Sequence, residues 1–255
     1  MELQELCARF DERLRTDEFA DLDASANGLQ VGPDEGTVEH VALAVDAAAA
    51  TIEAAADADA DLLVTHHGLS WGGIERVTGR TYDRIEALCR NDLALYVSHL
   101  PLDAHPELGN AAGVADRIGL EARERFGTMG AESIGQRGRL ADPVSGSALR
   151  ERLESEVTEG RRPVVHLPFG PEPIESVAIV TGSGVDWLEE AVESGADALV
   201  TGEGKQQVYH EAREAGVHVF LAGHYATETF GVRALGELAE EWGLSTTFID
   251  HPTGL

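Results

Sequence analysis

Lysine, cysteine and long apolar runs are the scarce features of this 255-residue chain. Its two cysteines, Cys7 and Cys89, are too few and too far apart to predict a disulfide framework or a cysteine-based zinc site. No stretch approaches the roughly 20 apolar residues that a membrane-spanning helix needs, so no membrane association is expected. The acidic N-terminus lacks the basic and then apolar order of a signal peptide. We therefore expect a cytoplasmic protein.

Positive charge is scarce as well. The chain has 46 acidic and 19 basic residues, Lys205 is its only lysine, and its formal charge is -27. Such a surface repels itself in dilute salt and is tolerated where salt screens it, which predicts a salt-adapted, halophilic protein. Nucleic-acid phosphates are bound by clusters of lysine and arginine, whereas this chain offers scattered arginines such as Arg161 and Arg162. The composition therefore weighs against DNA or RNA as a partner.

What the chain does contain is an internal repeat. The segment 38–43 matches 174–179 at an offset of 136 residues, and 61–68 matches 197–204 at the same offset without a gap. With 43% hydrophobic residues the chain can bury a substantial core, either as one large domain or as two small ones. A duplicated unit with similar donor residues in both copies predicts a site to which both halves contribute, and we expect a two-metal centre.

Each copy alternates short strands with helices. The order strand, helix, strand, helix, strand is predicted at about 38–45, 47–57, 61–66, 79–91 and 93–98, and again near 174–181, 185–194, 197–201, 205–215 and 217–222. This alternation predicts an α/β fold of two duplicated βαβ halves, with largely parallel sheets packed around a dinuclear metal site. The halves are expected at about 37–125 and 172–251. The segment 126–171 breaks the symmetry and is expected to form a small connecting subdomain.

Ligands of parallel sheets bind at the carboxyl ends of the strands, where His66 and His67 close an apolar strand. Adjacent side chains of a strand point to opposite sides, so two ions on either side of the strand end could take one histidine each. Histidines that make only ordinary hydrogen bonds are the alternative. A doublet at a strand end, with two further His–carboxylate pairs in the chain, favours metal ligation.

The second copy ends in His224, four residues before Glu228. If a helix begins near Thr227, Glu228 projects from its first turn, where the helix dipole favours a carboxylate that can bridge two cations. A first-turn capping carboxylate is the alternative.

The first copy ends in His99, four residues before Asp103. Pro101 lies between them and predicts a loop rather than a regular helix interior, because proline lacks an amide hydrogen. Asp103 is the stronger candidate ligand, while His99 either binds metal or orients Asp103. His105 has no counterpart in the other copy and ranks lower.

The repeat places Glu203 where the first copy has His67. A carboxylate at this strand end is a candidate general base or water-positioning group, and a structural role in a turn fits equally well. The nearby segment 182–184, Gly-Ser-Gly, could cradle an anion with its backbone amides or form a tight turn.

Four blocks of the sequence together resemble the Nif-three-like family of dinuclear metal-centre proteins, whose members are often called GTP cyclohydrolase 1 type 2 homologues. The blocks cover 27–31, 66–71, 99–106 and 223–228, and the resemblance extends over nearly the whole chain in the same order. It implies two divalent ions per subunit, with five protein ligands: His66, His67, Asp103, His224 and Glu228. Glu228 would bridge the ions, with His67 and Asp103 on one ion and His66 and His224 on the other. The resemblance also implies a ring-shaped homohexamer.

Two functions fit these residues. The first is a metal-dependent hydrolase of the GTP cyclohydrolase 1 type 2 kind, acting on a nucleotide or phosphoester, with two cations that activate a water and with Glu203 moving protons. The second is a non-catalytic ring that stores, delivers or senses metal. Histidine and carboxylate donors suit zinc, iron or manganese. The acidic surface favours small or magnesium-complexed substrates over polyanions.

Overall fold

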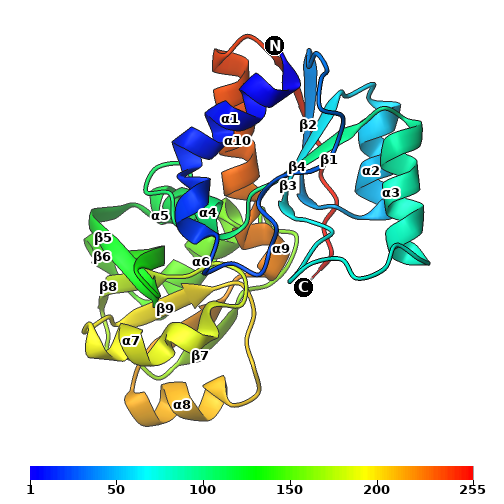
Figure 1. The fold of residues 1–255 in the computed structure, drawn as a ribbon. Coiled ribbons are helices and arrows are strands. Elements are labelled where there is room, and N and C mark those ends of the chain that lie inside the picture. The colour runs from blue at the N-terminus through cyan, green and yellow to red at the C-terminus, as the bar shows by residue number, and fades with distance from the viewer. Residues whose placement is uncertain (255) are drawn as a thin grey trace. The chain divides into compact units, whose positions relative to one another are not determined.

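The computed structural model describes residues 1–254, which form two compact units, each with its own sheet (Figure 1). Unit 1 comprises Met1–Leu102 and Gly231–His251, and unit 2 comprises Asp103–Phe230 and the residues from Pro252 onward. The chain therefore has a mixed α/β fold with two sheets. No helix within residues 1–254 is long and apolar enough to cross a membrane.

Unit 1 is built on a five-stranded sheet of order β1-β4-β3-β2-β11. Strands β4, β3, β2 and β11 run parallel, and β1 is antiparallel to β4. The strands are β1 (Gly28–Val31), β2 (His40–Asp46), β3 (Leu62–His67), β4 (Ala94–Val97) and β11 (Ser245–Phe248). The helices are α1 (Leu3–Leu14), η1 (Thr16–Phe19), α2 (Ala49–Asp57), α3 (Arg80–Arg90), α4 (Leu100–Asp103) and α10 (Thr229–Glu241), of which α4 and α10 also carry the chain to and from unit 2.

Helices cover both faces of this sheet, as Figure 1 shows. On one face Ile52 of α2 and Leu88 of α3 pack on Leu63 and Leu95 of the central strands, and all four are fully buried. On the other face Phe10 of α1 packs against Tyr96 of β4, with the two rings tilted. Burial of each large apolar side chain contributes about 1.5–3 kcal/mol to stability. The sheet is thus held between two apolar layers, and its strand ends are fixed in place.

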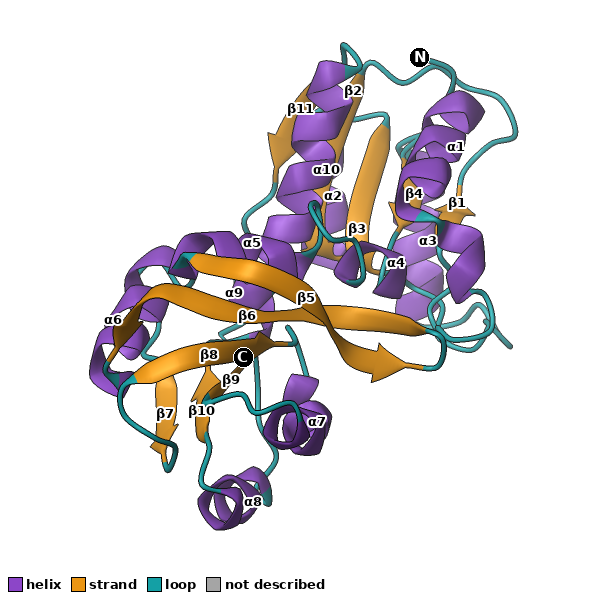
Figure 2. Cartoon of the chain, turned by 90° about the vertical axis from the view of Figure 1, so that its left-hand side faces the viewer, coloured by secondary structure: helices purple, strands orange, loops and turns teal. Residues whose placement is uncertain are grey.

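Unit 2 is built on a six-stranded sheet of order β5-β6-β8-β9-β10-β7 (Figure 2). Strands β8, β9 and β10 run parallel, and the other three are antiparallel to their neighbours. The strands are β5 (Leu120–Met129), β6 (Glu132–Val144), β7 (Val165–Pro168), β8 (Ile174–Ile179), β9 (Ala198–Thr201) and β10 (His218–Leu221). The helices are α5 (Asn110–Ile118), α6 (Gly146–Glu156), η2 (Gly184–Trp187), α7 (Leu188–Glu193), α8 (Val208–Ala215) and α9 (His224–Thr227).

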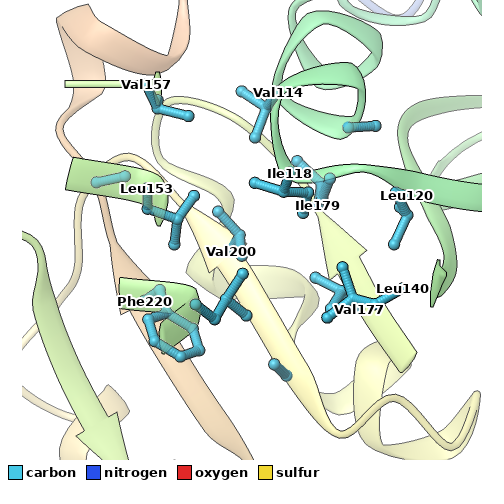
Figure 3. Packing of buried hydrophobic residues seen from close by; sticks show 14 of the residues in the cluster. Val114, Ile118, Leu120, Leu140, Leu153, Val157, Val177, Ile179, Val200 and Phe220 are labelled. Carbon is cyan, nitrogen blue, oxygen red and sulfur yellow. The ribbon is translucent and has the colours of Figure 1, made fainter. Parts of the chain in front are cut away.

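The core of unit 2 lies between helices α5 and α6 and the parallel strands. Ile118 of α5 and Leu153 of α6 pack toward Val177, Val200 and Phe220 of the three parallel strands, one from each strand (Figure 3). All five side chains are fully buried. This packing fixes the carboxyl ends of β8, β9 and β10 relative to one another.

The internal repeat is confirmed at the level of strand register. Val41 pairs with Leu62 in unit 1, and Val177 pairs with Ala198 in unit 2, so both partners are displaced by the same 136 residues. Asp61 accepts the backbone N–H groups of residues 39 and 40, and Asp197 accepts those of residues 175 and 176. The duplication therefore repeats both a strand pairing and the carboxylate that ties its start.

The expected connecting subdomain at 126–171 is not a separate body. Its residues form the end of β5 and all of β6, α6 and β7, which lie within the unit 2 sheet and its core. The last strand, β11, joins the unit 1 sheet instead of the second copy, because it pairs with β2. The units therefore divide the chain differently from the predicted halves at 37–125 and 172–251.

One local prediction also needed correction. The stretch from His99 to Asp103 was expected to be a loop, whereas Leu100–Asp103 forms the short helix α4. Pro101 is accommodated because it lies in the first turn, where a backbone N–H has no partner within the helix.

Candidate metal centre

Three histidines meet at the carboxyl ends of two neighbouring strands in unit 1. His66 and His67 end β3, and His99 follows β4, whose register with β3 pairs Val97 with Thr65. The nitrogens that they can offer to a metal lie within 4.8 Å of one another. The rings of His66 and His67 lie together, with centroids 4.7 Å apart, rather than on opposite sides of the strand. The strand stops at His67, so strict alternation no longer separates the two side chains.

Each of these three imidazoles has its Nδ1 atom at an oxygen acceptor. Nδ1 of His66 lies 2.9 Å from the carbonyl oxygen of Ser98, and Nδ1 of His67 lies 2.9 Å from Oδ1 of Asp46. Nδ1 of His99 lies 2.9 Å from Oδ1 of Asp23. An Nδ1–H group that donates to oxygen leaves the lone pair on Nε2, which is the arrangement typical of metal-binding histidines.

Asp23 is the centre of the support beneath His99. Its side chain is almost fully buried and contacts the His99 ring, the amide nitrogen of Asn27 and the backbone N–H of Leu100. Burial opposes the charge on this carboxylate, but the hydrogen bonds from His99 and Asn27 outweigh it and lower the pKa of Asp23 to about 2. Oδ1 of Asn27 also accepts the backbone N–H of His99, at 2.7 Å.

The block 27–31 thus serves to position the histidine loops. Besides Asn27, it supplies Gln30, whose Oε1 accepts the backbone N–H of Leu69 at 2.9 Å. Gly68 leaves room for the Gln30 side chain, because a Cβ atom at Gly68 would overlap it. This explains why the segment after the histidine doublet begins with glycine.

Unit 2 carries a second group of donors at the ends of β9 and β10. The register of these strands pairs Thr201 with Leu221, so Glu203 and His224 both follow the strand ends. His224 is the first residue of α9, and its Nε2 atom lies 3.1 Å from Oε2 of Glu228. Its Nδ1 atom lies 3.1 Å from Oε1 of Glu203. The imidazole therefore lies between two carboxylates.

Charge dominates the chemistry of His224. Burial disfavours its protonated form, but the hydrogen bond and charge of Glu228, followed by those of Glu203, raise the pKa of His224 to about 9. The pKa of Glu203 is lowered by its hydrogen bonds from Ser183 and His224. The Oγ atom of Ser183 donates to Oε1 of Glu203 at 2.5 Å. Glu203 is therefore an ionised group that orients His224, and its predicted role in proton transfer stays a prediction.

Two carboxylates of unit 2 are buried. Glu228 is 3% exposed and Asp103 is 8% exposed. Oδ1 of Asp103 accepts a hydrogen bond from Asn110 at 2.8 Å and one from Thr181 at 3.4 Å. Burying a carboxylate is costly unless cations or donors surround it. Glu228, a buried carboxylate beside the imidazole of His224, is suited to binding a divalent cation, and Asp103 is a second buried carboxylate held by its own donors.

Glycine at position 182 allows Glu228 to approach the backbone. Gly182 has a φ of +58°, and a Cβ atom there would overlap Oε1 of Glu228. The rest of the segment 182–184 uses its amides internally, since the Gly182 N–H donates to Thr227 and the Gly184 N–H donates to Thr201. The alternative of a tight turn therefore describes this segment better than an anion cradle.

The His–carboxylate pairs of the two copies differ by one position. His99 lies two residues beyond Val97, while His224 lies three residues beyond Leu221, the register equivalent of Val97.

His105 has a structural role, because its Nδ1 atom accepts the backbone N–H groups of Glu107 and Leu108. Sequence reasoning missed Asp23 and Asp46 as partners of the histidines. Asp46 pairs directly with His67 across β2 and β3, so the strand register could have identified it.

Comparison with known proteins identifies the family of the chain. Residues 1–253 match the model of the family described as Duf34/NIF3 (NGG1p interacting factor 3). The chain is 58% identical to a GTP cyclohydrolase 1 type 2 homolog of Halobacterium salinarum and 41% identical to one of Archaeoglobus fulgidus, with the full length of each protein covered. Among solved structures it is similar to protein ybgI, of unknown function, and to TTHA1606 of Thermus thermophilus. Both are 37% identical over their full lengths, with TM-scores of 0.91 and 0.90. The chain therefore belongs to the Duf34/NIF3 family.

Proposed function

We propose that this protein binds two divalent metal ions through His66, His67, Asp103, His224 and Glu228 and acts as a metal-dependent hydrolase on a nucleotide or phosphoester. The observation that carries the proposal is the shared arrangement of the imidazoles. Each candidate histidine has its Nδ1 atom at an oxygen acceptor. This leaves Nε2 of His66 and His67 for a metal, while Nε2 of His224 lies beside the second candidate ligand, Glu228. Zinc, iron and manganese all suit such donors.

The buried acids support the same proposal. Glu228 and Asp103 are nearly inaccessible to solvent, and each is held by neighbouring side chains. Divalent cations at such a site would polarise a substrate oxygen and activate a water for attack. The chain's own residues supply the orientation: Asn110 and Thr181 fix Asp103, and Glu203 fixes the ring of His224. His99 lies with His66 and His67, either as a further metal ligand or as a neighbour that packs against their rings.

We further propose that Glu203 takes part in proton transfer as well as in orienting His224. Its carboxylate is partly exposed and ionised, so it could accept a proton from a reacting water. We also propose a ring-shaped homohexamer, on the basis of the family resemblance. The names of the full-length relatives support a reaction of the GTP cyclohydrolase 1 type 2 kind.

The decisive experiment compares three proteins prepared in high salt: wild type, His66→Ala and Glu203→Gln. Each is loaded with zinc, iron or manganese and incubated with GTP and simple phosphoesters. A hydrolase predicts turnover in the wild type, loss of metal and turnover in His66→Ala, and loss of turnover with metal retained in Glu203→Gln. Turnover in the wild type no greater than in His66→Ala would reject the hydrolase.

The same experiment tests the alternative, a non-catalytic metal-handling or regulatory protein. This alternative is favoured by the number of residues that hold the donor side chains in place, because fixed donors bind metal tightly whether or not catalysis occurs. It predicts exchangeable metal in the wild type, no turnover, and no effect of Glu203→Gln on metal content.

A further inference from the structure

Trp71 is 47% exposed and, with Tyr82 and Tyr209, is among the exposed aromatic residues of the described chain. Aromatic residues make up 5% of the sequence, and large ones such as Phe10, Phe19 and Phe220 are fully buried. Trp242 packs against Phe10. An indole carries a large apolar surface, so leaving half of it in solvent forgoes stabilisation that burial would provide.

The exposure of Trp71 is built into the backbone. Trp71 forms an isolated antiparallel β-bridge with Ser25. On either side the backbone is tied to the same segment, because the N–H of Gly72 donates to Ala24 at 2.6 Å and the N–H of Ala26 donates to Ser70 at 3.2 Å. The indole is therefore presented from an anchored segment rather than from the tip of an untethered loop.

The indole also contacts two of the three clustered histidines. Its ring centroid lies 5.0 Å from that of His99, with the two planes nearly perpendicular at 80°. It lies 6.0 Å from the centroid of the His67 ring. One side of the indole thus rests against the candidate metal donors, while the remainder faces solvent. This geometry resembles an aromatic wall at the edge of a binding site.

We propose that Trp71 is the stacking surface for a planar nitrogen heterocycle, such as a purine ring, in the ligand that binds at the His66, His67 and His99 group. This inference rests on the proposed function of that group and adds a residue that selects the ligand. Stacking suits this protein in particular, since a chain with a formal charge of -27 attracts anionic groups poorly. Stacking on an aromatic ring needs no positive charge.

A second copy of the chain is the competing occupant of this surface. Ile74 and Val77 are also exposed, at 42% and 47%, and they follow Trp71 closely in sequence. The ring of Trp71 contacts two of the clustered histidines. The contact with the donor residues favours a ligand, and the oligomeric state of the variants provides the test.

The experiment uses two probes that differ in the heterocycle: guanosine 5′-monophosphate and ribose 5-phosphate. Affinities are measured by calorimetry for the full-length wild type, Trp71→Phe, Trp71→Leu and Trp71→Ala in high salt. We expect the wild type to prefer the nucleotide by about tenfold or more, a preference that Trp71→Phe largely keeps and that Trp71→Leu and Trp71→Ala lose. The affinity for ribose 5-phosphate should stay the same in all four proteins.

Tryptophan fluorescence provides the matched control. Trp187, whose Nε1 donates to the backbone of Thr128, lies in the other unit. Guanosine 5′-monophosphate should quench the wild type and Trp187→Phe, and this quenching should disappear in Trp71→Phe. An unchanged nucleotide preference in both Trp71→Leu and Trp71→Ala would overturn the inference. So would a lower molar mass of these variants by light scattering with their ligand affinities intact.

Metal analysis separates this inference from the function on which it rests. If the wild type binds metal and the ring preference is absent, stacking by Trp71 is rejected and the metal centre stands. If the wild type binds no metal, the proposed function fails whatever the probes show.

Discussion

Gly182 and Glu228 approach each other so closely that a methyl group on Gly182 would overlap the Oε1 atom of the carboxylate. Gly182 also has a φ of +58°, a backbone conformation that glycine adopts without strain. The buried carboxylate of Glu228 therefore owes its position to the lack of a side chain 46 residues earlier in the sequence. If Glu228 binds metal, Gly182 is indispensable to the site although it offers no donor.

We predict that Gly182→Ala weakens metal binding by about 10- to 100-fold, because the new Cβ displaces Glu228. The control is Gly195→Ala, since Gly195 has a φ of +73° and open space around it. Both variants carry a backbone penalty of about 1 kcal/mol, so a loss of metal affinity that is confined to Gly182→Ala comes from the overlap with Glu228. Equal metal affinities in the two variants would contradict this account of Glu228.

The repeated carboxylates offer a test of the duplication. Asp61 and Asp197 each accept two backbone N–H groups at the start of corresponding strands. We expect Asp61→Ala and Asp197→Ala each to lower the free energy of unfolding by about 1–2 kcal/mol, because those amides lose their acceptor. Denaturant titration measures this, with the exposed Asp34→Ala as the control that changes stability by less than about 0.5 kcal/mol. Control-like behaviour of either variant would show that its carboxylate has no such role.

The half-buried His166 and the buried His218 form a pair that should make stability depend on pH. Nε2 of His166 lies 3.0 Å from Nδ1 of His218, whose Nε2 atom lies 3.0 Å from the carbonyl oxygen of Pro171. His166 also stacks on Phe220, with centroids 4.2 Å apart. Burial, followed by the charges of His218 and Arg150, lowers the pKa of His166 to about 4. The folded protein therefore holds His166 neutral.

The sign of the effect follows from linkage. The unfolded chain binds a proton at His166 below about pH 6.5, whereas the folded chain does so only near pH 4. The contribution of neutral His166 to the free energy of unfolding is fully present above pH 6.5. It declines by about 2 kcal/mol as the pH falls toward 4, after allowance for partial solvent screening. Urea unfolding at several pH values should show this decline in the wild type and a shallower one in His166→Asn. Parallel pH profiles would refute the assignment to His166.

The acidic surface predicts salt dependence. With 46 acidic against 19 basic residues, repulsion destabilises the folded state in dilute buffer, and salt screens it over about 10 Å at 0.1 M. We expect the melting temperature to rise steadily as KCl is raised from dilute buffer to molar concentrations. A matched titration with sucrose separates screening from general exclusion effects. A melting temperature that is insensitive to KCl would speak against adaptation to salt.

The strands of the repeat were predictable from the sequence, because they are short runs of buried apolar residues bounded by polar turns. The register of β2 with β3, and that of β8 with β9, follows the same 136-residue offset that the sequence shows. The candidate ligands were also visible, since they lie at the ends of these strands. The candidate ligands at the strand ends are therefore encoded in the local sequence.

The edge of the unit 2 sheet was not predictable in the same way. β5 runs from Leu120 to Met129, but five consecutive residues of it, 121–125, are exposed and charged or small. Such a strand has no apolar alternation, and only its pairing with β6 identifies it.

The partners of the histidines were missed for a related reason. Asp23 and His99 lie 76 residues apart, and only the folded chain brings them together.

Metal content per chain is the most direct test of the central claim that five side chains hold two divalent ions. The measurement is elemental analysis of protein purified in high salt, for the wild type, His66→Ala and Glu228→Gln. We predict two ions per chain in the wild type, with a clear loss in both variants while their folded state, followed by circular dichroism, is kept. Substoichiometric metal in the wild type, or metal that both variants retain in full, would contradict the account.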